Sequence, residues 1–440
     1  MESIRFGNFY YTVQTDGSAV IEKYTGDGEG VEIPAVVDGH PVKEIGARAF
    51  AEHDTLFSVT VPRGVKSIGE RAFAGCYEML AVFLPDGLEH IGCGAFAGCW
   101  SLQELRIPTG VRSIGSIAFA GCSKLTHITI PDGVTAIEER TFADCWRLRI
   151  SALPGSVERI GLRAFENCGK LREFTLPEGV SVLGDRAFSH CLNLETIHLP
   201  LSLKEVGENP FYRCERLTNV DVPNGHAHLE MREGFLIGKP AHRLIAHLLS
   251  RKEAYVRVPN GIREIGPYAF CENAIAERVI FPDTLTEIGH HAFADCKALA
   301  EIELPGSVRA IGCRAFSACK KLQKATLIHG VENIGLGAFS YCEALETVTL
   351  PDTLKEIESM AFLLCHGLKS VRLSGALQSI GRCAFFYCDA LETVTAEGDI
   401  HKLGEDIFKS SEKVSVVTSG ENLRRYCAEN RIPCRTNEEA

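Results

Sequence analysis

Three similar stretches of this 440-residue chain each carry two cysteines around an alanine–phenylalanine pair. They read IGCGAFAGC (91–99), IGCRAFSAC (311–319) and IGRCAFFYC (380–388). Paired cysteines can bind a metal ion, form a disulfide or exchange electrons as a redox pair. The choice among these readings and a purely structural one decides whether the chain is an enzyme or a scaffold.

Most of the cysteines share one position in a longer period. Twelve of the 18 lie three residues after a phenylalanine, at 76, 99, 122, 145, 168, 191, 214, 296, 319, 342, 365 and 388. A zinc site needs four ligands that converge at about 2.3 Å, and evenly spaced residues along a stack of repeats do not converge. We therefore predict a buried column whose weak S–H donors face neighbouring backbone carbonyls.

The other cysteines stand outside this column. Cys93 and Cys313 lie on the opposite side of their phenylalanine, near a turn, where we expect more exposure. Cys427 and Cys434 lie beyond the array, and two free thiols are favoured there over a disulfide. Because the N-terminus MESIRFGNFYYTVQ shows no export signal, a reducing compartment and free thiols are expected.

The period is 23 residues. Phenylalanine recurs in that register at 50, 73, 96, 119, 142, 165, 188 and 211, and again at 270, 293, 316, 339, 362, 385 and 408. A single step of 59 residues separates the two series. A repeat of this length cannot bury its own apolar face, so stacked repeats must share one core.

The unit FADCKALAEIELPGSVRAIGCRA (293–315) shows what each repeat contains. Ile302–Glu303–Leu304 alternates apolar and polar residues and predicts a short strand that Pro305 ends. The Ala–Phe segments predict short helical turns that direct the phenylalanine inward. Strands from successive units are then expected to pair in parallel at about 4.8 Å.

These residues resemble the BspA-like class of leucine-rich repeats, whose pattern L-x-x-I-x-L-P-x-x-V-x-x-I-G-x-x-A-F-x-x-C is met almost unit by unit from 42 to 408. The resemblance implies an α/β fold: a right-handed leucine-rich repeat solenoid with a parallel β-sheet on the concave side and short helical turns on the convex side. Proteins of this family are often bacterial surface or secreted proteins implicated in adhesion. The resemblance thus implies a surface location, whereas the missing export signal predicts a cytoplasmic one.

Five segments follow from the repeat register. We predict an N-terminal cap (1–41), a first repeat array (42–223), a hairpin insertion (224–258), a second array (259–411) and a C-terminal cap with a tail (412–440). The cap at each end covers an otherwise open sheet edge. In the last segment, Leu423, Tyr426 and Cys427 have helical spacing and are expected to close the core.

Composition and motifs argue against several functions. A net charge of −11 disfavours a nucleic-acid partner, and no apolar stretch of about 18 residues predicts a membrane span. No phosphate-binding loop, zinc-protease helix or nucleophile elbow occurs, so we predict no catalytic residue, no metal and no cofactor. His226, His228 and Glu230 alternate and can contact a metal ion on one strand face, but a solvated polar strand is the favoured reading.

Exposed aromatic residues are the candidate binding site. The strand residues that face away from the core are expected to form the binding face of a solenoid, and aromatic residues are enriched at interface centres. The candidates all belong to the first array: Phe57, Tyr77, Leu80, Phe83, Trp100, Arg106 and Trp146. The alternative reading is that loops fold these rings over the edge of the core.

The sequence therefore predicts a non-catalytic, monomeric scaffold that binds a protein in an adhesion-type role. Two alternatives stay open. The first is a glycan or cell-wall binding module, for which Trp and Tyr side chains along the loops provide stacking surfaces. The second is a cytosolic assembly scaffold whose partner is another bacterial protein.

Overall fold

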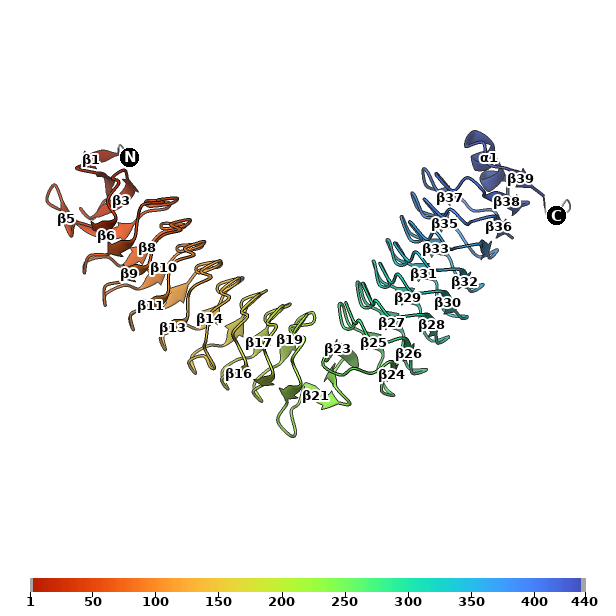
Figure 1. The fold of residues 1–440 in the computed structure, drawn as a ribbon, viewed down its shortest axis with the longest axis horizontal. Coiled ribbons are helices and arrows are strands. Elements are labelled where there is room, and N and C mark those ends of the chain that lie inside the picture. The colour runs from red at the N-terminus through yellow and green to blue at the C-terminus, as the bar shows by residue number, and fades with distance from the viewer. Residues whose placement is uncertain (1–2, 437–440) are drawn as a thin grey trace. The chain divides into compact units, whose positions relative to one another are not determined.

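A computed structural model describes residues 3–436 of the chain. The chain divides into two units, the first ending at Leu229 and the second beginning at Glu230. Each unit is a stack of coils that follow one another along the sequence (Figure 1). The division falls inside the predicted insertion, while the exact boundaries of the five predicted segments stay predictions.

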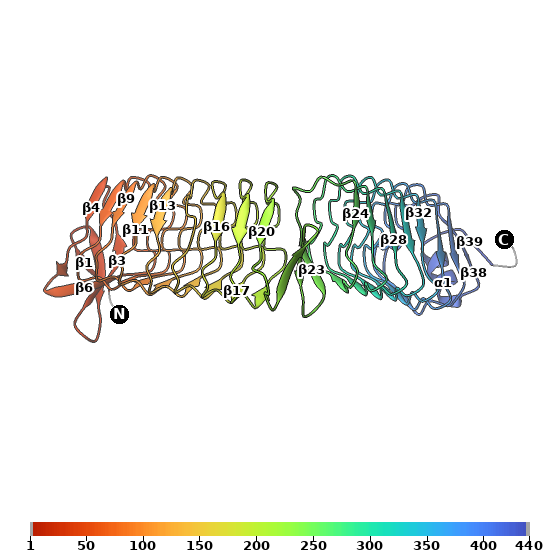
Figure 2. The same cartoon turned by 90° about the horizontal axis from the view of Figure 1, so that it is seen from below.

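Most coils contribute one strand to each of two parallel ladders, which we call the long ladder and the short ladder. In the first unit the long ladder consists of β4 (Gly30–Glu32), β7 (Ser58–Thr60), β9 (Ala81–Phe83), β11 (Glu104–Arg106), β13 (His127–Thr129), β16 (Glu173–Thr175), β18 (Thr196–His198) and β20 (Asn219–Asp221). The short ladder consists of β6 (His40–Ile45), β8 (Ser67–Ile68), β10 (His90–Ile91), β12 (Ser113–Ile114), β14 (Ala136–Ile137), β15 (Arg159–Ile160), β17 (Val182–Leu183) and β19 (Glu205–Val206). Figure 2 shows the two series on different sides of the coils.

The second unit repeats this arrangement. Its long ladder is one nine-stranded sheet of β24 (Tyr255–Arg257), β26 (Arg278–Ile280), β28 (Glu301–Leu304), β30 (Lys324–Leu327), β32 (Thr347–Thr349), β34 (Ser370–Leu373), β36 (Thr393–Ala396), β38 (Ser415–Thr418) and β39 (Cys434–Arg435). Its short ladder contains β21 (Leu229–Arg232), β22 (Phe235–Gly238), β23 (Arg243–His247), β25 (Glu264–Ile265), β27 (Glu287–Ile288), β29 (Ala310–Ile311), β31 (Asn333–Ile334), β33 (Glu356–Ile357), β35 (Ser379–Ile380) and β37 (Lys402–Leu403).

The predicted strand periodicity is confirmed in the unit that begins at Phe293. Ile302 and Leu304 are buried, whereas Glu303 between them is exposed. β28 and β30 pair in parallel with Glu301 opposite Lys324, a shift of one repeat. The short ladder was not predicted, because strands of two residues are too short to show an alternation.

The predicted helical turns around the Ala–Phe pairs are wrong. These segments are chains of tight turns with two residues in the left-handed region, as at Arg314 (φ 52°) and Ala318 (φ 58°) on either side of Phe316. The amides of these three residues donate to Leu336, Ala338 and Ser340 of the next coil at 2.8 Å. Backbone groups are therefore satisfied between coils and not within a helix.

Phenylalanine rings form a stack through each unit. From Phe270 to Phe408, successive ring centroids lie 4.7 to 5.7 Å apart and the ring planes differ by at most 17°. A glycine precedes most Ala–Phe turns because the coils approach closely there. A Cβ at Gly312 would lie 2.7 Å from the backbone nitrogen of His290, which forces some shift in the packing.

Both ends of the chain carry caps. At the N-terminus, β1 (Ile4–Phe6), β2 (Phe9–Val13) and β3 (Ala19–Tyr24) form antiparallel pairs, and β3 then pairs with β6 in parallel. The remaining strand there, β5 (Val36–Val37), pairs with β6. At the other end, α1 (Glu421–Glu429) is the one α-helix among residues 3–436, and it buries Leu423, Tyr426 and Cys427 as predicted. Residues 437–440 of the predicted tail lie outside the described part of the chain.

The predicted insertion contains a hairpin, and this hairpin is part of the sheet. β22 and β23 pair antiparallel, and β23 then pairs in parallel with β25, so the hairpin belongs to the edge of the short ladder. His247 in β23 stands 23 residues before Phe270 and takes the phenylalanine position of this coil. Its ring stacks on that of Phe270 with centroids 4.8 Å apart.

Candidate binding surface

The cysteine column is a structural ladder of hydrogen bonds. Each of the twelve column thiols donates to the carbonyl oxygen of the phenylalanine 26 residues earlier, at 3.0 to 3.3 Å. Ser411 occupies the same position in the last coil, and its hydroxyl donates to Phe385 at 2.9 Å. The predicted contact with neighbouring carbonyls is confirmed.

Burial keeps the thiols of Cys76, Cys122 and Cys388 protonated at neutral pH. It raises the pKa of Cys76 to about 11 and the pKa values of Cys122 and Cys388 to about 12. A thiolate is the form that attacks disulfides and binds metals, so these three protonated thiols are chemically inert at neutral pH. All 18 cysteines are free, including Cys427 and Cys434.

Thiol reagents are expected to distinguish two classes of cysteine. Cys93 is exposed and Cys313, Cys383 and Cys434 are partly exposed, whereas the column is buried. In native protein at mildly alkaline pH, a maleimide followed by peptide mass mapping is expected to modify Cys93 first and to leave the column unmodified until denaturant is added. Cys93→Ser removes the fastest phase and Cys122→Ser does not. Rapid native labelling of the column would contradict its structural role.

Two predicted aromatic residues contact each other on neighbouring coils. The rings of Tyr77 and Trp100 have centroids 4.5 Å apart, and both side chains are exposed, Trp100 at 53%. A Cβ added at Gly98 or Gly121 would lie 3.9 Å from the indole nitrogen of Trp100. The indole therefore lies over bare backbone of its own coil and the next, with much of its surface open to solvent.

The predicted strand residues lie on the outward face of the first coils. Phe57, Leu80 and Phe83 are all exposed, and Phe83 reaches 59%. The carbonyl of Phe57 accepts the amide of Leu80 at 2.8 Å, so these two share a position on adjacent coils. Phe83 in β9 stands opposite Thr60 in β7 and lines a hollow of about 500 Å³. We call Phe57, Tyr77, Leu80, Phe83 and Trp100 the aromatic patch.

The two remaining candidates lie further along the array. Arg106 in β11 is exposed and occupies the repeat position of Phe83 one coil later. Trp146 is 47% exposed and stands two coils after Trp100, with Ser123 in the coil between them. Ring contact therefore joins Tyr77 to Trp100, while Trp146 is a separate exposed aromatic residue.

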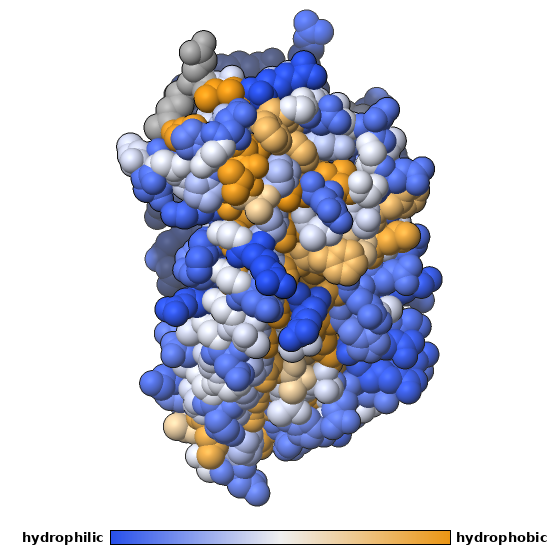
Figure 3. Space-filling model, turned by 90° about the vertical axis from the view of Figure 1, so that its left-hand side faces the viewer, coloured by the Kyte–Doolittle hydropathy of each residue, from blue (hydrophilic) through white to orange (hydrophobic). Residues whose placement is uncertain are grey.

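The N-terminal end of the first unit presents further apolar side chains. Figure 3 shows this end covered mostly by hydrophilic residues, with hydrophobic residues visible between them. Exposed members there are Ile4 at 44%, Phe6 at 37% and Val36 at 51%. They are dispersed over β1 and β5 of the cap and form no ring pair like that of Tyr77 and Trp100.

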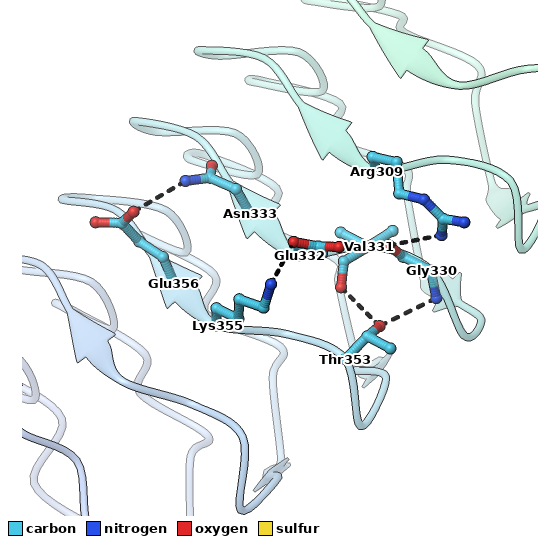
Figure 4. A network of polar contacts seen from close by, with 8 residues as sticks. All are labelled: Arg309, Gly330, Val331, Glu332, Asn333, Thr353, Lys355 and Glu356. Atoms are coloured by element: carbon cyan, nitrogen blue, oxygen red, sulfur yellow. Dashed lines mark hydrogen bonds and ion pairs between the residues drawn. The ribbon is translucent and has the colours of Figure 1, made fainter.

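Several charges on the second unit are paired between coils. Figure 4 shows one such network, in which Lys355 contacts Glu332 at 2.6 Å and Asn333 donates to Glu356 at 3.1 Å. Further along, Arg372 contacts Asp352 and Glu397 at 2.9 and 2.7 Å. Exposed pairs of this kind contribute at most about 1 kcal/mol each, and they leave a solvated, charge-compensated face.

The structure does not assemble a metal site from the candidate histidines. His226 is buried, its Nε2 lies 3.1 Å from the carbonyl of Pro200, and its Nδ1 accepts the amides of His228 and Leu229. Both ring nitrogens are thus engaged by backbone. Within residues 3–436, no group of three or more His, Cys, Asp or Glu residues has the geometry to hold an ion.

One irregularity of the first unit, a missing long-ladder strand, was not predicted from the sequence. Ser151 occupies the position nine after the phenylalanine, where neighbouring coils bury Ile128 and Phe174. No long-ladder strand forms there, and one bridge, Ala152 to Thr175, connects this coil to β16. A hollow of about 530 Å³ opens beside it, lined by Arg149, Ile150, Ser151, Lys170, Arg172, Glu173 and Asn193. The polar Ser151, at a position that is apolar in the neighbouring coils, is the sequence feature that indicates this break.

The parallel ladders, the ring stack and the exposed aromatic face define a leucine-rich repeat solenoid. Comparison with known families agrees: the BspA type leucine rich repeat region matches residues 43–168, 142–232, 250–366 and 332–430. The chain belongs to this family. No curated protein matches it significantly.

Solved bacterial structures share the fold. A leucine rich cell surface protein of Faecalibacterium prausnitzii is 26% identical, with 90% of this chain and 95% of that one covered and a TM-score of 0.62. A leucine-rich repeat protein of Bacteroides ovatus is also 26% identical, with coverages of 98% and 99% and a TM-score of 0.53. The pneumococcal vaccine antigen PcpA, at 21% identity, coverages of 99% and 98% and a TM-score of 0.53, is similar in fold. In the described part of this chain, no helix is long and apolar enough to cross a bilayer.

Proposed function

We propose that this chain is a non-catalytic binding protein that acts at a bacterial cell surface and engages a protein partner through the aromatic patch. The observation that carries the proposal is the exposure of Phe83 and Trp100, at 59% and 53%, on consecutive coils of one array. Trp and Tyr are enriched at binding hot spots together with Arg, and Phe is enriched in the cores of interfaces. The likeness to a cell surface protein of Faecalibacterium prausnitzii supports the location.

A glycan is the second candidate ligand. The contacting rings of Tyr77 and Trp100 favour it, because the two side chains together offer a wider apolar surface than either ring alone. A sugar ring stacks on such a surface through its C–H face. This candidate differs from the first in needing the Tyr77–Trp100 pair and not Phe83.

The double variant Phe83→Ala/Trp100→Ala is expected to weaken binding to a protein partner by at least about tenfold. Purified chain and variant are compared on microarrays of extracellular proteins and of glycans. The matched control is Tyr255→Ala/Tyr387→Ala, which removes two exposed aromatic residues from the second unit. Protein signals that persist in the control and fall in the double variant support the proposal.

Two results would contradict it. If the folded Phe83→Ala/Trp100→Ala variant binds proteins as tightly as the parent chain, the aromatic patch is not part of the interface. Signals confined to glycans, lost in Trp100→Ala and kept in Phe83→Ala, assign the patch to sugar binding. Circular dichroism and the urea midpoint verify that each variant is folded.

A further inference from the structure

The coil that carries Ser151 combines a break in the long ladder with unpaired positive charge. Arg147 and Arg149 lie five and seven residues after Phe142, and Lys170 and Arg172 occupy the same two positions after Phe165. Successive coils are spaced by about 4.8 Å, so the four cations form a two-by-two grid. All four side chains are exposed.

Two adjoining hollows bring these cations together. Arg149 and Lys170 line both the hollow beside Ser151, of about 530 Å³, and a second one of about 400 Å³ that also includes Thr126, His127 and Arg147. We call the two together the basic hollow. Their volumes are in the range of small-ligand pockets.

The basic hollow gathers cations that are not compensated, whereas some other cations of the unit are paired with an acidic residue. Lys66 contacts Glu89 at 2.7 Å and Arg159 contacts Glu138 at 2.7 Å, each across one coil step. By contrast, Arg147, Arg149 and Lys170 form no ion pair with any residue between 3 and 436, and Arg172 approaches Glu195 only to 4.0 Å. The acidic lining residue, Glu173, contacts Nε2 of His198 at 3.2 Å.

We propose that the basic hollow binds an acidic segment of a partner protein. A guanidinium fork matches a carboxylate in a bidentate geometry, and Arg149 and Arg172 line the same hollow from consecutive coils. One carboxylate can bridge them, while Lys170 and Arg147 are placed for the next acidic residue. This site goes beyond the aromatic patch and uses none of its residues.

The lining favours a peptide over a sulfated glycan. Ile150 contributes apolar surface and Asn193 an amide, and the Trp146 ring lies 3.6 Å from a Cβ position at Gly169, beside Lys170. A peptide carries apolar side chains and carboxylates together, whereas a uniformly sulfated chain offers no apolar group.

The test uses the full chain and a fluorescein-labelled decapeptide with six glutamates and one phenylalanine. In fluorescence anisotropy, Arg149→Gln/Arg172→Gln is expected to weaken binding at least about tenfold. The control Arg257→Gln/Lys324→Gln removes the same charge from the second unit and is expected to stay within about twofold of the parent. Affinity falls between about 50 and 300 mM salt. The Phe83→Ala/Trp100→Ala variant keeps full affinity for this peptide, which separates this proposal from the first.

The proposal is overturned by equal peptide affinity in folded Arg149→Gln/Arg172→Gln or by an equal loss in the control. It is also overturned when a heparin octasaccharide binds through Arg149 and Arg172 while the decapeptide does not, because the hollow then recognises sulfated glycans. A peptide with glutamines in place of the glutamates is expected not to bind.

Discussion

Raising the pH from 9 to 11 is expected to unfold the first unit, because its buried thiols ionise more readily in the unfolded chain than in the folded one. The pKa of Cys76 is raised to about 11 and that of Cys122 to about 12, from an ordinary value of 9.0. A raised pKa contributes stability that is complete below pH 9 and is lost as pH rises toward the folded-state pKa. Each thiol removes about 1.4 kcal/mol per pH unit in that range.

By pH 11 these two residues together lower the free energy of unfolding by about 5 kcal/mol. That is comparable with the total stability of a typical domain, about 5 to 15 kcal/mol. The pKa values of Cys99 and Cys145, in the same column, are also raised by burial. Urea midpoints followed by circular dichroism at pH 7, 9, 10 and 11, with reductant present, measure the loss.

The Cys76→Ser/Cys122→Ser variant separates thiol titration from other alkaline effects. A serine hydroxyl keeps a donor for the phenylalanine carbonyl, as Ser411 does, but does not titrate in this range. The variant is expected to lose less stability between pH 9 and 11 than the parent, whatever its stability at pH 7. Cys93→Ser, at an exposed position, leaves the pH dependence unchanged. Identical alkaline profiles in parent and double variant would contradict the role of the column.

The column residues explain why so much of the fold could be predicted. Ile302, Cys296 and Phe293 recur at fixed offsets, and a stack places every equivalent residue in the same surroundings. The pattern of one repeat therefore predicts which positions are buried in all the others. The structural role of the thiols follows in the same way, because they occupy one of these buried positions. Fifteen copies of the pattern make that inference stronger than any single motif.

The backbone conformation of the Ala–Phe turns could not be predicted from the repeat pattern. Arg314 and Ala318 adopt left-handed backbone conformations that their residue types do not signal, since this region favours glycine. Their conformations are selected by the carbonyls of the next coil, which accept their amides. A local pattern such as RAFSA predicts a helical turn, and the tertiary hydrogen bonds override it.

The candidate site was predictable only in part. Exposure of Phe83 and Trp100 follows from their offsets, but the contact of Tyr77 with Trp100 depends on the bare backbone at Gly98 and Gly121. The basic hollow depends on Ser151, where the loss of one apolar side chain removes a strand. A substitution at one repeat position therefore predicts a local change in structure best where all other coils carry the same residue type at that position.

His247 replaces the recurring phenylalanine in its coil, and this replacement is expected to make one edge of the second unit sensitive to acid. Its ring is 4% exposed and stacks on Phe270, and Nδ1 lies 3.3 Å from the side-chain amide of Asn273. Burial, aided by the nearby charge of Arg251, lowers the pKa of His247 to about 4 from 6.5. A lowered pKa contributes stability above pH 6.5 that is lost as pH falls through 4.

The hairpin of β22 and β23 is therefore expected to lose about 3 kcal/mol between pH 6.5 and 4. Hydrogen exchange of the β22, β23 and β25 amides at pH 7 and 4.5, corrected for intrinsic rates, measures this local loss. His247→Phe restores the ring found at this position in the other coils and is expected to abolish the acid dependence, although it removes the contact with Asn273. The control His401→Asn replaces a histidine at an exposed position and is expected to keep the acid dependence of the parent. Equal acid sensitivity in parent and His247→Phe would show that other groups open this edge, because a phenylalanine cannot take up a proton.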